Sequence, residues 1–412
     1  MNRDLIMQLA QRYDSFYLYD EAEIDRAVSR LQAAFPGIGF LYSVKNNPNP
    51  AVVRAVLGRG LGVDAASLAE VKAGVRCGLD QRMIQYSAPG KPQADLEAAL
   101  ELCTLVADSA GEADRIGQAA RDRGMTAGVG LRINPDFSYA GPGGAASKFG
   151  IDQGLALASL AGWEAAGGLR VAGLHVHLRS QELDHRVLEG YYRRYMAMAE
   201  EFVQALGRPL EFLNMGSGIG IPYLPGDRPV DVAALGAAAA ELAAALHQKY
   251  PQTRVYIETG RYAAGRAGVY AAKVLDVKQS HGKTFAVLCN TLNGMIRPCL
   301  EQLVLGSGGA AAPSCEPLYG GPGCFPLTVL QGGPGTEPVT LVGNLCTGAD
   351  LVARDVLLPR LHPGSLVVME NAGSYAAALS SMQFSSQTPP AQVFAALDGT
   401  LTEFAPAAPD IL

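Results

Sequence analysis

The sequence predicts an α/β fold, a (β/α)8 TIM-type barrel joined to a mainly β domain, and two patterns support this prediction. Between residues 39 and 262, eight short apolar strands alternate with amphipathic, alanine-rich helices, as in a closed parallel barrel. Beyond Gly265 the chain changes to strands joined by turns, and a strand-like segment at Phe16–Tyr19 precedes the barrel. We therefore expect a barrel over residues 25–265 and a β-rich domain built from residues 1–24 together with residues 266–412.

The expected elements follow in chain order. The eight barrel strands are Gly39–Val44, Gly60–Val63, Met83–Tyr86, Thr104–Val106, Gly128–Ile133, Val171–His177, Phe212–Met215 and Arg254–Glu258. Helical periodicity between them marks Pro50–Leu57, Ser67–Cys77, Gln93–Leu100, Glu112–Arg123 and Arg186–Ala205. The second domain should contain strands at Val269–Val277, Thr284–Leu288, Val339–Val342 and Ser365–Glu370, and a glycine- and proline-rich surface loop at Gly306–Gly335.

Composition narrows the class of protein. The 412 residues exceed one ordinary domain, and a formal charge of −6 argues against nucleic acid or an anionic membrane as a partner. No apolar run approaches the length of a membrane span, and the first residues contain no signal-peptide core. The seven cysteines are odd in number and scattered, without a CxxC pair or a zinc-ligand spacing. We expect a cytoplasmic protein with no metal site.

One lysine stands at a position that is typical of chemistry in α/β proteins. Phe40–Val44 has the pattern of a buried strand, Lys45 follows it, and Asn46–Pro48 ends it. A lysine at the carboxyl end of a barrel strand faces the barrel mouth, where such folds carry their reactions. In a partly dry pocket the amine has a lowered pKa and can form a Schiff base with a carbonyl. The alternative is a strand-end lysine that extends into solvent.

Two further strand ends carry polar or glycine-rich segments. His175 and His177 lie on one face of a strand, so both can point into the barrel mouth, either as functional groups or as structural lining. Asn214–Gly220 places glycines after the next strand, where backbone N–H groups can approach an anion. The spacing is similar to a dinucleotide fingerprint, but Pro222 follows and no long helix begins there. A phosphate-binding loop is therefore the functional interpretation of this segment.

Three more motifs lie in the second half of the chain. Ile257–Tyr262 places a carboxylate at a strand end before a tight glycine turn, Gly343–Asp350 contains a cysteine, and Asn371–Tyr375 contains a tyrosine. The six segments, in this order, resemble the pyridoxal-phosphate (PLP) decarboxylases of fold type III, which are built on the alanine-racemase-like barrel. That family includes ornithine, arginine and diaminopimelate decarboxylases. The resemblance covers nearly the whole chain.

The resemblance implies pyridoxal 5′-phosphate as cofactor and assigns roles to individual residues. Lys45 corresponds to the lysine that forms the Schiff base, His177 to the histidine stacked on the cofactor ring, and Glu258 to the acid paired with the ring nitrogen. Cys346 corresponds to the cysteine that protonates the carbanion across a dimer interface, which implies a homodimer. The other residues that should contact the cofactor or lie near it are Asp64, Glu70, Ser180, Gly216, Ser217, Gly218, Gly260, Arg261, Tyr262 and Tyr375.

Glu258 indicates which reaction the site performs. Loss of CO₂ leaves electrons on the α-carbon of the substrate, and a protonated cofactor ring has to accept them. A carboxylate keeps the ring nitrogen protonated, whereas racemases similar to this pattern carry an arginine there. The sequence therefore favours a decarboxylase over an amino-acid racemase. A non-catalytic PLP-binding regulator is disfavoured by the C-terminal β domain and Cys346, and a pseudoenzyme by the intact set of Lys45, Glu258 and Cys346.

The residue after the cysteine departs from the family pattern. Thr347 stands where ornithine and diaminopimelate decarboxylases carry an acid that binds the distal end of the substrate. Without that acid, burying a substrate ammonium would cost about 2–5 kcal/mol of binding free energy, unless Asp350 supplies the counter-charge. Arg297 lies in a segment similar to the diaminopimelate type, which implies that it binds a substrate carboxylate. Arg179 either adds positive charge at the pocket or points away from it.

These departures suggest an amino-acid substrate with a masked distal amine. Within the family, the chain looks most like the decarboxylases of carboxylate siderophore pathways, which act on citryl-linked diamino acids. In that interpretation, Arg179, Arg261 and Arg297 would meet the citrate carboxylates. A carrier-bound amino acid remains an alternative substrate, as does a free diamino acid such as diaminopimelate or ornithine.

Overall fold

Eight parallel strands of the computed structural model close into a barrel; the structure describes residues 2–216, 218–224, 226–306 and 323–405. Strand β2 pairs with β3, the order continues through β4, β5, β6, β10, β11 and β12, and β12 pairs with β2. The bounds are β2 Gly39–Ser43, β3 Gly62–Ala65, β4 Ile84–Tyr86, β5 Thr104–Ala107, β6 Ala127–Asn134, β10 Leu169–His175, β11 Phe212–Asn214 and β12 Arg254–Thr259. Each strand overlaps an expected one, and the TIM-type barrel is confirmed.

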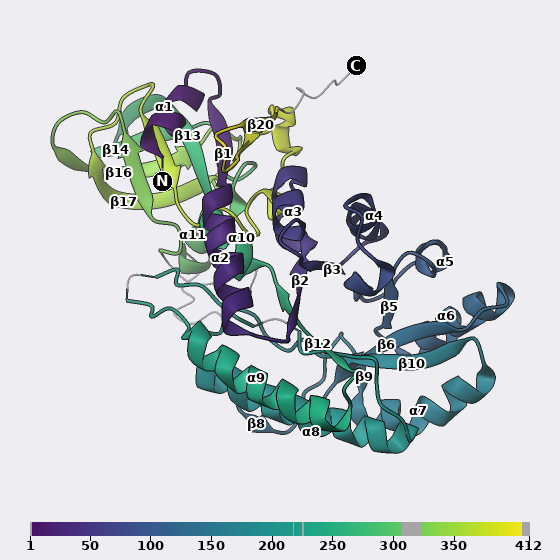
Figure 1. The fold of residues 1–412 in the computed structure, drawn as a ribbon. Coiled ribbons are helices and arrows are strands. Elements are labelled where there is room, and N and C mark those ends of the chain that lie inside the picture. Colours follow the sequence, from purple (N-terminus) through teal and green to yellow (C-terminus); the bar gives the residue numbers. More distant parts are fainter. Residues whose placement is uncertain (1, 217, 225, 307–322, 406–412) are drawn as a thin grey trace.

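Helices cover the outside of the barrel (Figure 1). They are α2 Glu21–Ala34, α3 Pro50–Leu57, α4 Leu68–Arg76, α5 Gln93–Ala99, α6 Ala110–Asp122, α7 Gln153–Ala166, α8 His185–Leu206 and α9 Val232–Lys249, and the short α10 Arg261–Ala264 follows β12. Helix starts use side-chain caps: Ser67 and Ser109, for example, accept the N–H groups of Glu70 and Glu112. Helices α7 and α9 are so rich in alanine that the periodicity of larger apolar residues, which predicted other helices, is weak in them.

Two aromatic rings fill part of the barrel interior. Phe212 and Tyr256 pack together as a buried cluster with Leu41. Small residues on the neighbouring strands make this possible: a Cβ atom on Gly173 would lie 2.5 Å from the Phe212 ring, and one on Gly39 would lie 2.7 Å from the Tyr256 ring. The barrel is therefore a packed core, and its polar side chains gather at the carboxyl ends of the strands.

The second domain is a mainly β structure, as expected, and it includes the first strand of the chain. Its sheet has the order β17-β16-β14-β13-β1-β19-β20, and β18 links β13 to β15. The bounds are β1 Ser15–Asp20, β13 Gly268–Ser280, β14 Lys283–Leu288, β15 Leu327–Leu330, β16 Thr336–Gly343, β17 Leu351–Pro359, β18 Leu366–Met369, β19 Ala391–Ala395 and β20 Leu401–Phe404. Strand β1 pairs antiparallel with β13 and parallel with β19, and its purple ribbon runs among green and yellow strands in Figure 1. These pairings support the division into residues 25–265 and residues 1–24 with 266–412, which stays a prediction.

The expected surface loop at Gly306–Gly335 is only partly a loop. Residues 307–322 lie outside the described residues, and α11 Ile296–Gly306 precedes them. Leu327–Leu330 forms β15 and pairs with β18, because its apolar residues find a partner far along the chain. Three short strands, β7 Phe137–Ser138, β8 Gly141–Pro142 and β9 Ile151–Asp152, and the N-terminal helix α1 Arg3–Leu9 complete the α-helices and strands of the described chain. Its five 3-10 helices are η1 Val44–Asn46, η2 Gln81–Met83, η3 Gly265–Ala267, η4 Ala377–Leu379 and η5 Phe384–Ser386. Among the helices of the described chain, none is long and apolar enough to cross a membrane.

Candidate active site

A cavity of about 720 Å³ opens at the carboxyl ends of the barrel strands. Most of its wall comes from the barrel, and one side chain, Tyr375, comes from the β domain. Seven residues predicted from the sequence line it together: Lys45, His175, His177, Arg179, Ser180, Glu258 and Tyr375. The remaining wall is formed by Ala66, Ser87, Ala88, Pro89, Arg132, Phe149, Leu178 and Gln181.

Lys45 lies in a helical turn directly after β2, and 43% of its side chain is exposed toward this space. Its Nζ donates a hydrogen bond to Asp64 Oδ2 at 2.5 Å. Desolvation would lower the pKa of Lys45, but Asp64, Glu258 and Tyr375 outweigh it and raise the pKa above its ordinary value. The expected lowering is therefore wrong for this structure, because a buried carboxylate pairs with the amine. Asp64 is placed to take up the proton when the amine reacts with a carbonyl.

Asp64 is held by a second partner, and Glu70 shapes the same strand end. Ser87 Oγ donates to Asp64 Oδ1 at 2.6 Å, so both oxygens of this carboxylate are oriented. Glu70 Oε2 accepts the backbone N–H of Ala66 at 2.6 Å, while Ser67 Oγ caps the N–H of Glu70 at 3.3 Å. Glu70 therefore fixes the segment after β3, which forms part of the cavity wall.

Glu258 is a buried carboxylate at the end of β12. Its Oε1 lies 2.9 Å from His175 Nε2 and accepts a hydrogen bond from Asn214 Nδ2 at 3.1 Å. Burial alone would raise the pKa of Glu258, but the neighbouring His175, Lys45 and His177 hold it well below its ordinary value. Glu258 is thus held in its ionised form and can accept a hydrogen bond from a protonated ring nitrogen.

His177 lines the cavity in its neutral form. Burial lowers its pKa to about 4, so the imidazole carries no charge at neutral pH. Ser180 Oγ lies 3.4 Å from His177 Nε2, where the two groups can share a hydrogen bond. A neutral planar ring in a cavity wall suits stacking against a planar aromatic ligand.

The glycines of the predicted phosphate loop stand where chain segments approach closely. Gly216 has a φ of 66°, and a Cβ atom there would lie 2.1 Å from the Val176 carbonyl oxygen and 3.0 Å from His177 Cα. Gly218 has a φ of 151°, which also favours glycine. A Cβ atom on Gly260 would lie 3.0 Å from Asn46 Nδ2. Ser217 lies outside the described residues.

Arg261 orients the tyrosine that the β domain contributes. It is 5% exposed, its Nη1 donates to Tyr223 Oη at 2.7 Å, and its guanidinium lies 5.1 Å from the centroid of the Tyr375 ring. Tyr375 itself has a φ of 54° and donates its N–H to the Asn46 carbonyl at 2.8 Å. By contrast, Tyr262 lies outside the cavity wall, and its partly buried ring has Arg266 as a charged neighbour.

The structure does not bring Cys346 and Thr347 to the cavity of their own chain. Both lie in the turn after β16, where Cys346 is exposed and the Thr347 hydroxyl accepts the N–H of Ala349 at 3.3 Å. Neither residue lines the cavity around Lys45.

Asp350 closes the same turn from inside. It is 3% exposed. Its oxygens accept the backbone N–H groups of Leu292 and Leu345, each at 2.9 Å, and the hydroxyl of Thr291. Arg297 is 1% exposed and lies behind the cavity, with its guanidinium 4.8 Å from the Phe325 ring centroid and 5.5 Å from that of Tyr223. Substrate binding by Asp350 and Arg297 stays a prediction.

Sequence reasoning missed several residues of this site. Ser87 orients Asp64, Arg132 lines the cavity, and Asn214 links Glu258 to Gln85 at 2.7 Å. A charged residue within the apolar strand of Arg132 was a signal that could have identified it. Ser87 directly follows a barrel strand, as Lys45 does, but a serine there has no distinctive spacing.

This donor set fits pyridoxal phosphate. Its aldehyde needs an amine, its ring nitrogen needs a carboxylate, and its phosphate needs N–H and O–H donors. The amine is that of Lys45, and the carboxylate is the ionised Glu258. The segments around Ser180 and Gly216 contain the N–H and O–H donors. Among the described side chains, no group of three histidine, cysteine or acidic residues could hold a metal ion. The fold and the site define an enzyme that binds a carbonyl cofactor at the mouth of a barrel.

Comparisons with known proteins agree with this class. Residues 21–265 match the family model of the pyridoxal-dependent decarboxylases, pyridoxal binding domain. The L-glutamyl-[BtrI acyl-carrier protein] decarboxylase of Niallia circulans is 28% identical, over 94% of this chain and 90% of that protein. The diaminopimelate decarboxylase of Methanothermobacter thermautotrophicus is 28% identical, over 94% and 88% respectively. The solved diaminopimelate decarboxylase of Helicobacter pylori complexed with L-lysine has the same fold, with a TM-score of 0.83, 24% identity, and coverage of 99% of this chain and 97% of that one.

The chain belongs to the pyridoxal-dependent decarboxylase family, because the family model matches more than half of its length. It is accordingly a PLP-dependent amino-acid decarboxylase, a carboxy-lyase.

Proposed function

We propose that this decarboxylase acts on an α-amino acid whose distal end is conjugated, with an amino acid joined to a carrier through its side chain as the leading form. The observation that carries the proposal is the turn after β16. Thr347 replaces the acid of the free-diamino-acid enzymes, and Asp350, three residues later, uses its carboxylate to accept the backbone N–H groups of Leu292 and Leu345.

A free distal ammonium would find no accessible carboxylate in this turn, because Asp350 is buried and bonded to backbone N–H groups. Leaving the ammonium unpaired would cost about 2–5 kcal/mol of binding. Glu301 in α11 is a further carboxylate, but its Oε1 accepts the N–H of Gly323 at 3.0 Å and burial raises its pKa, which disfavours the charged form. A conjugated distal end carries no ammonium and avoids this loss. The decarboxylase of an L-glutamyl carrier protein, which aligns over 94% of this chain, supports the same substrate class.

Each site residue has a role in this proposal. PLP supplies an electron sink for the carbanion that CO₂ leaves behind. Lys45 binds the cofactor, Asp64 exchanges a proton with its amine, Glu258 keeps the ring nitrogen protonated, and His177 packs on the ring face. Phosphate binding falls to Ser180, Gly216, Ser217, Gly218, Gly260, Arg261 and Tyr375. We further propose a homodimer in which Cys346 of the other subunit protonates the product.

A citryl-linked diamino acid is the second candidate, and Arg179 favours it. This arginine lines the cavity and 57% of its side chain is exposed, although it also pairs with Glu182. Arg261 and Arg297, the other two arginines predicted to meet citrate, are 5% and 1% exposed and do not line the cavity. The citryl substrate therefore has less support than a carrier-bound one. The siderophore pathway and the cytoplasmic location stay predictions.

The test is CO₂ release by the PLP-loaded protein with a small panel of substrates. We would compare a glutamyl group joined to a carrier protein by a thioester of its side-chain carboxyl, which leaves the α-carboxylate free, with citryl-linked diaminopropionate and with free ornithine, lysine and diaminopimelate. Turnover of conjugates alone is expected, and the variant Thr347→Glu should gain activity on a free diamino acid. Preference of the unaltered enzyme for a free diamino acid would overturn the proposal.

A further inference from the structure

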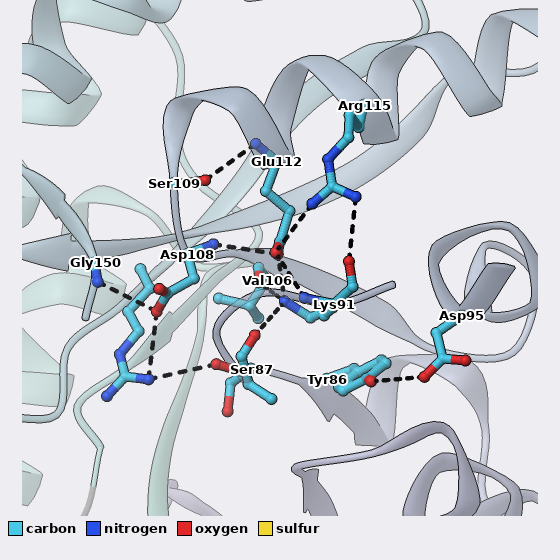
Figure 2. A network of polar contacts seen from close by, with 12 residues as sticks. Tyr86, Ser87, Lys91, Asp95, Val106, Asp108, Ser109, Glu112, Arg115 and Gly150 are labelled. Atoms are coloured by element: carbon cyan, nitrogen blue, oxygen red, sulfur yellow. Dashed lines mark hydrogen bonds and ion pairs between the residues drawn. The ribbon is translucent and has the colours of Figure 1, made fainter. Parts of the chain in front are cut away.

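A buried ion pair lies behind the cavity wall. Lys91 follows β4, Glu112 lies in the first turn of α6, and their side chains are 0% and 1% exposed. Lys91 Nζ lies 2.5 Å from Glu112 Oε1, and neither residue lines the cavity (Figure 2). The pair therefore does not bind substrate or cofactor directly.

Both members of the pair bind the backbone of strand-end segments. Lys91 Nζ also donates to the carbonyl oxygens of Ala88 at 2.8 Å and Val106 at 2.7 Å. Glu112 accepts the N–H groups of Lys91 at 3.2 Å and Asp108 at 3.3 Å (Figure 2). The ion pair thus joins the segment that follows β4 to the segment that follows β5.

Stability alone is a poor reason for such a pair. Removing two charges from water costs several kcal/mol, and apolar side chains of similar volume are often equally stable in their place. Here the charges serve to orient the backbone, since each charge-assisted hydrogen bond fixes a backbone group next to the cavity.

One arm of the network reaches Lys45. Ala88, whose carbonyl Lys91 holds, is the neighbour of Ser87, and both line the cavity. Ser87 Oγ in turn donates to Asp64 Oδ1 at 2.6 Å, and the other oxygen of Asp64 accepts from Lys45. The position of the segment after β4 therefore sets the position of the carboxylate beside the reactive amine.

The other arm reaches Arg132 and Phe149 in the cavity wall. Asp108, which donates its N–H to Glu112, also accepts the N–H of Gly150 at 3.2 Å (Figure 2). Its carboxylate lies 3.5 Å from Arg132 Nη1. The Arg132 guanidinium lies 4.4 Å from the centroid of the Phe149 ring, and both residues line the cavity. The same Nη1 donates to the Ser87 carbonyl at 3.4 Å, which connects the two arms.

We infer that Lys91 and Glu112 are positioning residues of the decarboxylation. They hold Ser87 and Asp108 in place. Ser87 in turn orients Asp64 beside Lys45, and Asp108 orients Arg132 in the cavity wall. Lys91 and Glu112 would have this role with either class of substrate, because Lys45 and Asp64 take part in the chemistry common to the family.

The double variant Lys91→Met/Glu112→Gln tests this role, because it removes both charges and leaves neither one unpaired. We expect a folded, PLP-binding protein whose kcat falls about tenfold or more while KM stays within about threefold. Without substrate and at fixed pH, the ratio of the absorbance bands of the bound cofactor should change, because Asp64 is no longer held beside Lys45.

Arg59→Met is the control. It breaks a partly buried pair with Glu21, whose side chains are 15% and 18% exposed, away from the cavity, and should lower stability without changing the absorbance or kcat. A folded double variant with wild-type kcat and absorbance would overturn the inference, and so would a rise in KM at unchanged kcat. If the double variant does not fold, Glu112→Gln alone keeps the shape of the side chain and is judged by the same outcomes.

Discussion

The amine of Lys45 lies 2.5 Å from a carboxylate, Asp64, whose side chain is fully buried. The amine is the more exposed partner, so a ligand in the cavity can reach it while Asp64 stays fixed by Ser87. This arrangement keeps the reactive nitrogen charged and oriented, and Asp64 is already in place to accept its proton.

Replacement of Lys45 tests that assignment. Lys45→Arg keeps a cation beside Asp64 but cannot form a Schiff base, so the protein should fold and lose at least about 10³-fold in kcat. Borohydride reduction followed by mass spectrometry should find the cofactor attached to the wild-type peptide and absent from the variant. Covalent cofactor on any other lysine would show that the assignment is wrong.

The neutral state of His177 predicts how stability depends on pH. Its pKa is about 4 in the folded chain and about 6.5 in an unfolded one, so the unfolded chain binds the extra proton between these values. The free energy of unfolding should therefore fall as pH is lowered from 6.5 to 4, with His177 contributing about 1–3 kcal/mol. His177→Phe should flatten this part of a urea-unfolding series, and His281→Asn, at an exposed turn, should not. An equal slope in wild type and His177→Phe would contradict the prediction.

The barrel interior predicts a strong effect at one glycine. Gly173→Ala would place a methyl group 2.5 Å from the Phe212 ring, and the ring sits in a packed core that cannot move freely. We expect a loss of about 1–3 kcal/mol in the free energy of unfolding. Gly154→Ala in α7 is the control, because its methyl group would meet no atom within 4 Å and alanine favours helix. Similar stabilities for the two variants would mean that the interior adapts.

The position of Cys346 predicts complementation between subunits. If the cysteine acts in the other subunit, Lys45→Ala and Cys346→Ala should each be nearly inactive alone. Mixing them under conditions that exchange subunits should restore about a quarter of wild-type activity, since half of the dimers are mixed and each has one intact site. No recovery, in a mixture shown to contain mixed dimers, would place the cysteine in its own chain's site.

Much of the fold was predictable because the barrel is built from local patterns. Each barrel strand is a short apolar run, and parallel strands bring their carboxyl ends together, so Lys45 and Glu258 could be placed in one site from sequence. The network of Asp350 could not, because its hydroxyl partner, Thr291, lies in a distant part of the sequence. For the same reason, the aromatic surroundings of Arg297 and the pairing of β15 depend on tertiary contacts that no periodicity records.

The place of β1 in the second sheet has a consequence for biosynthesis. Ser15–Asp20 leaves the ribosome before the barrel segments, yet it pairs with β13 and with β19, which are synthesised after the barrel. This strand therefore stays without its partners while all the barrel segments emerge. Tyr375, which completes the cavity wall, is also synthesised after the barrel. A nascent chain thus has no complete site when its barrel has been synthesised, and the unpaired strand is the segment that a chaperone would need to shield.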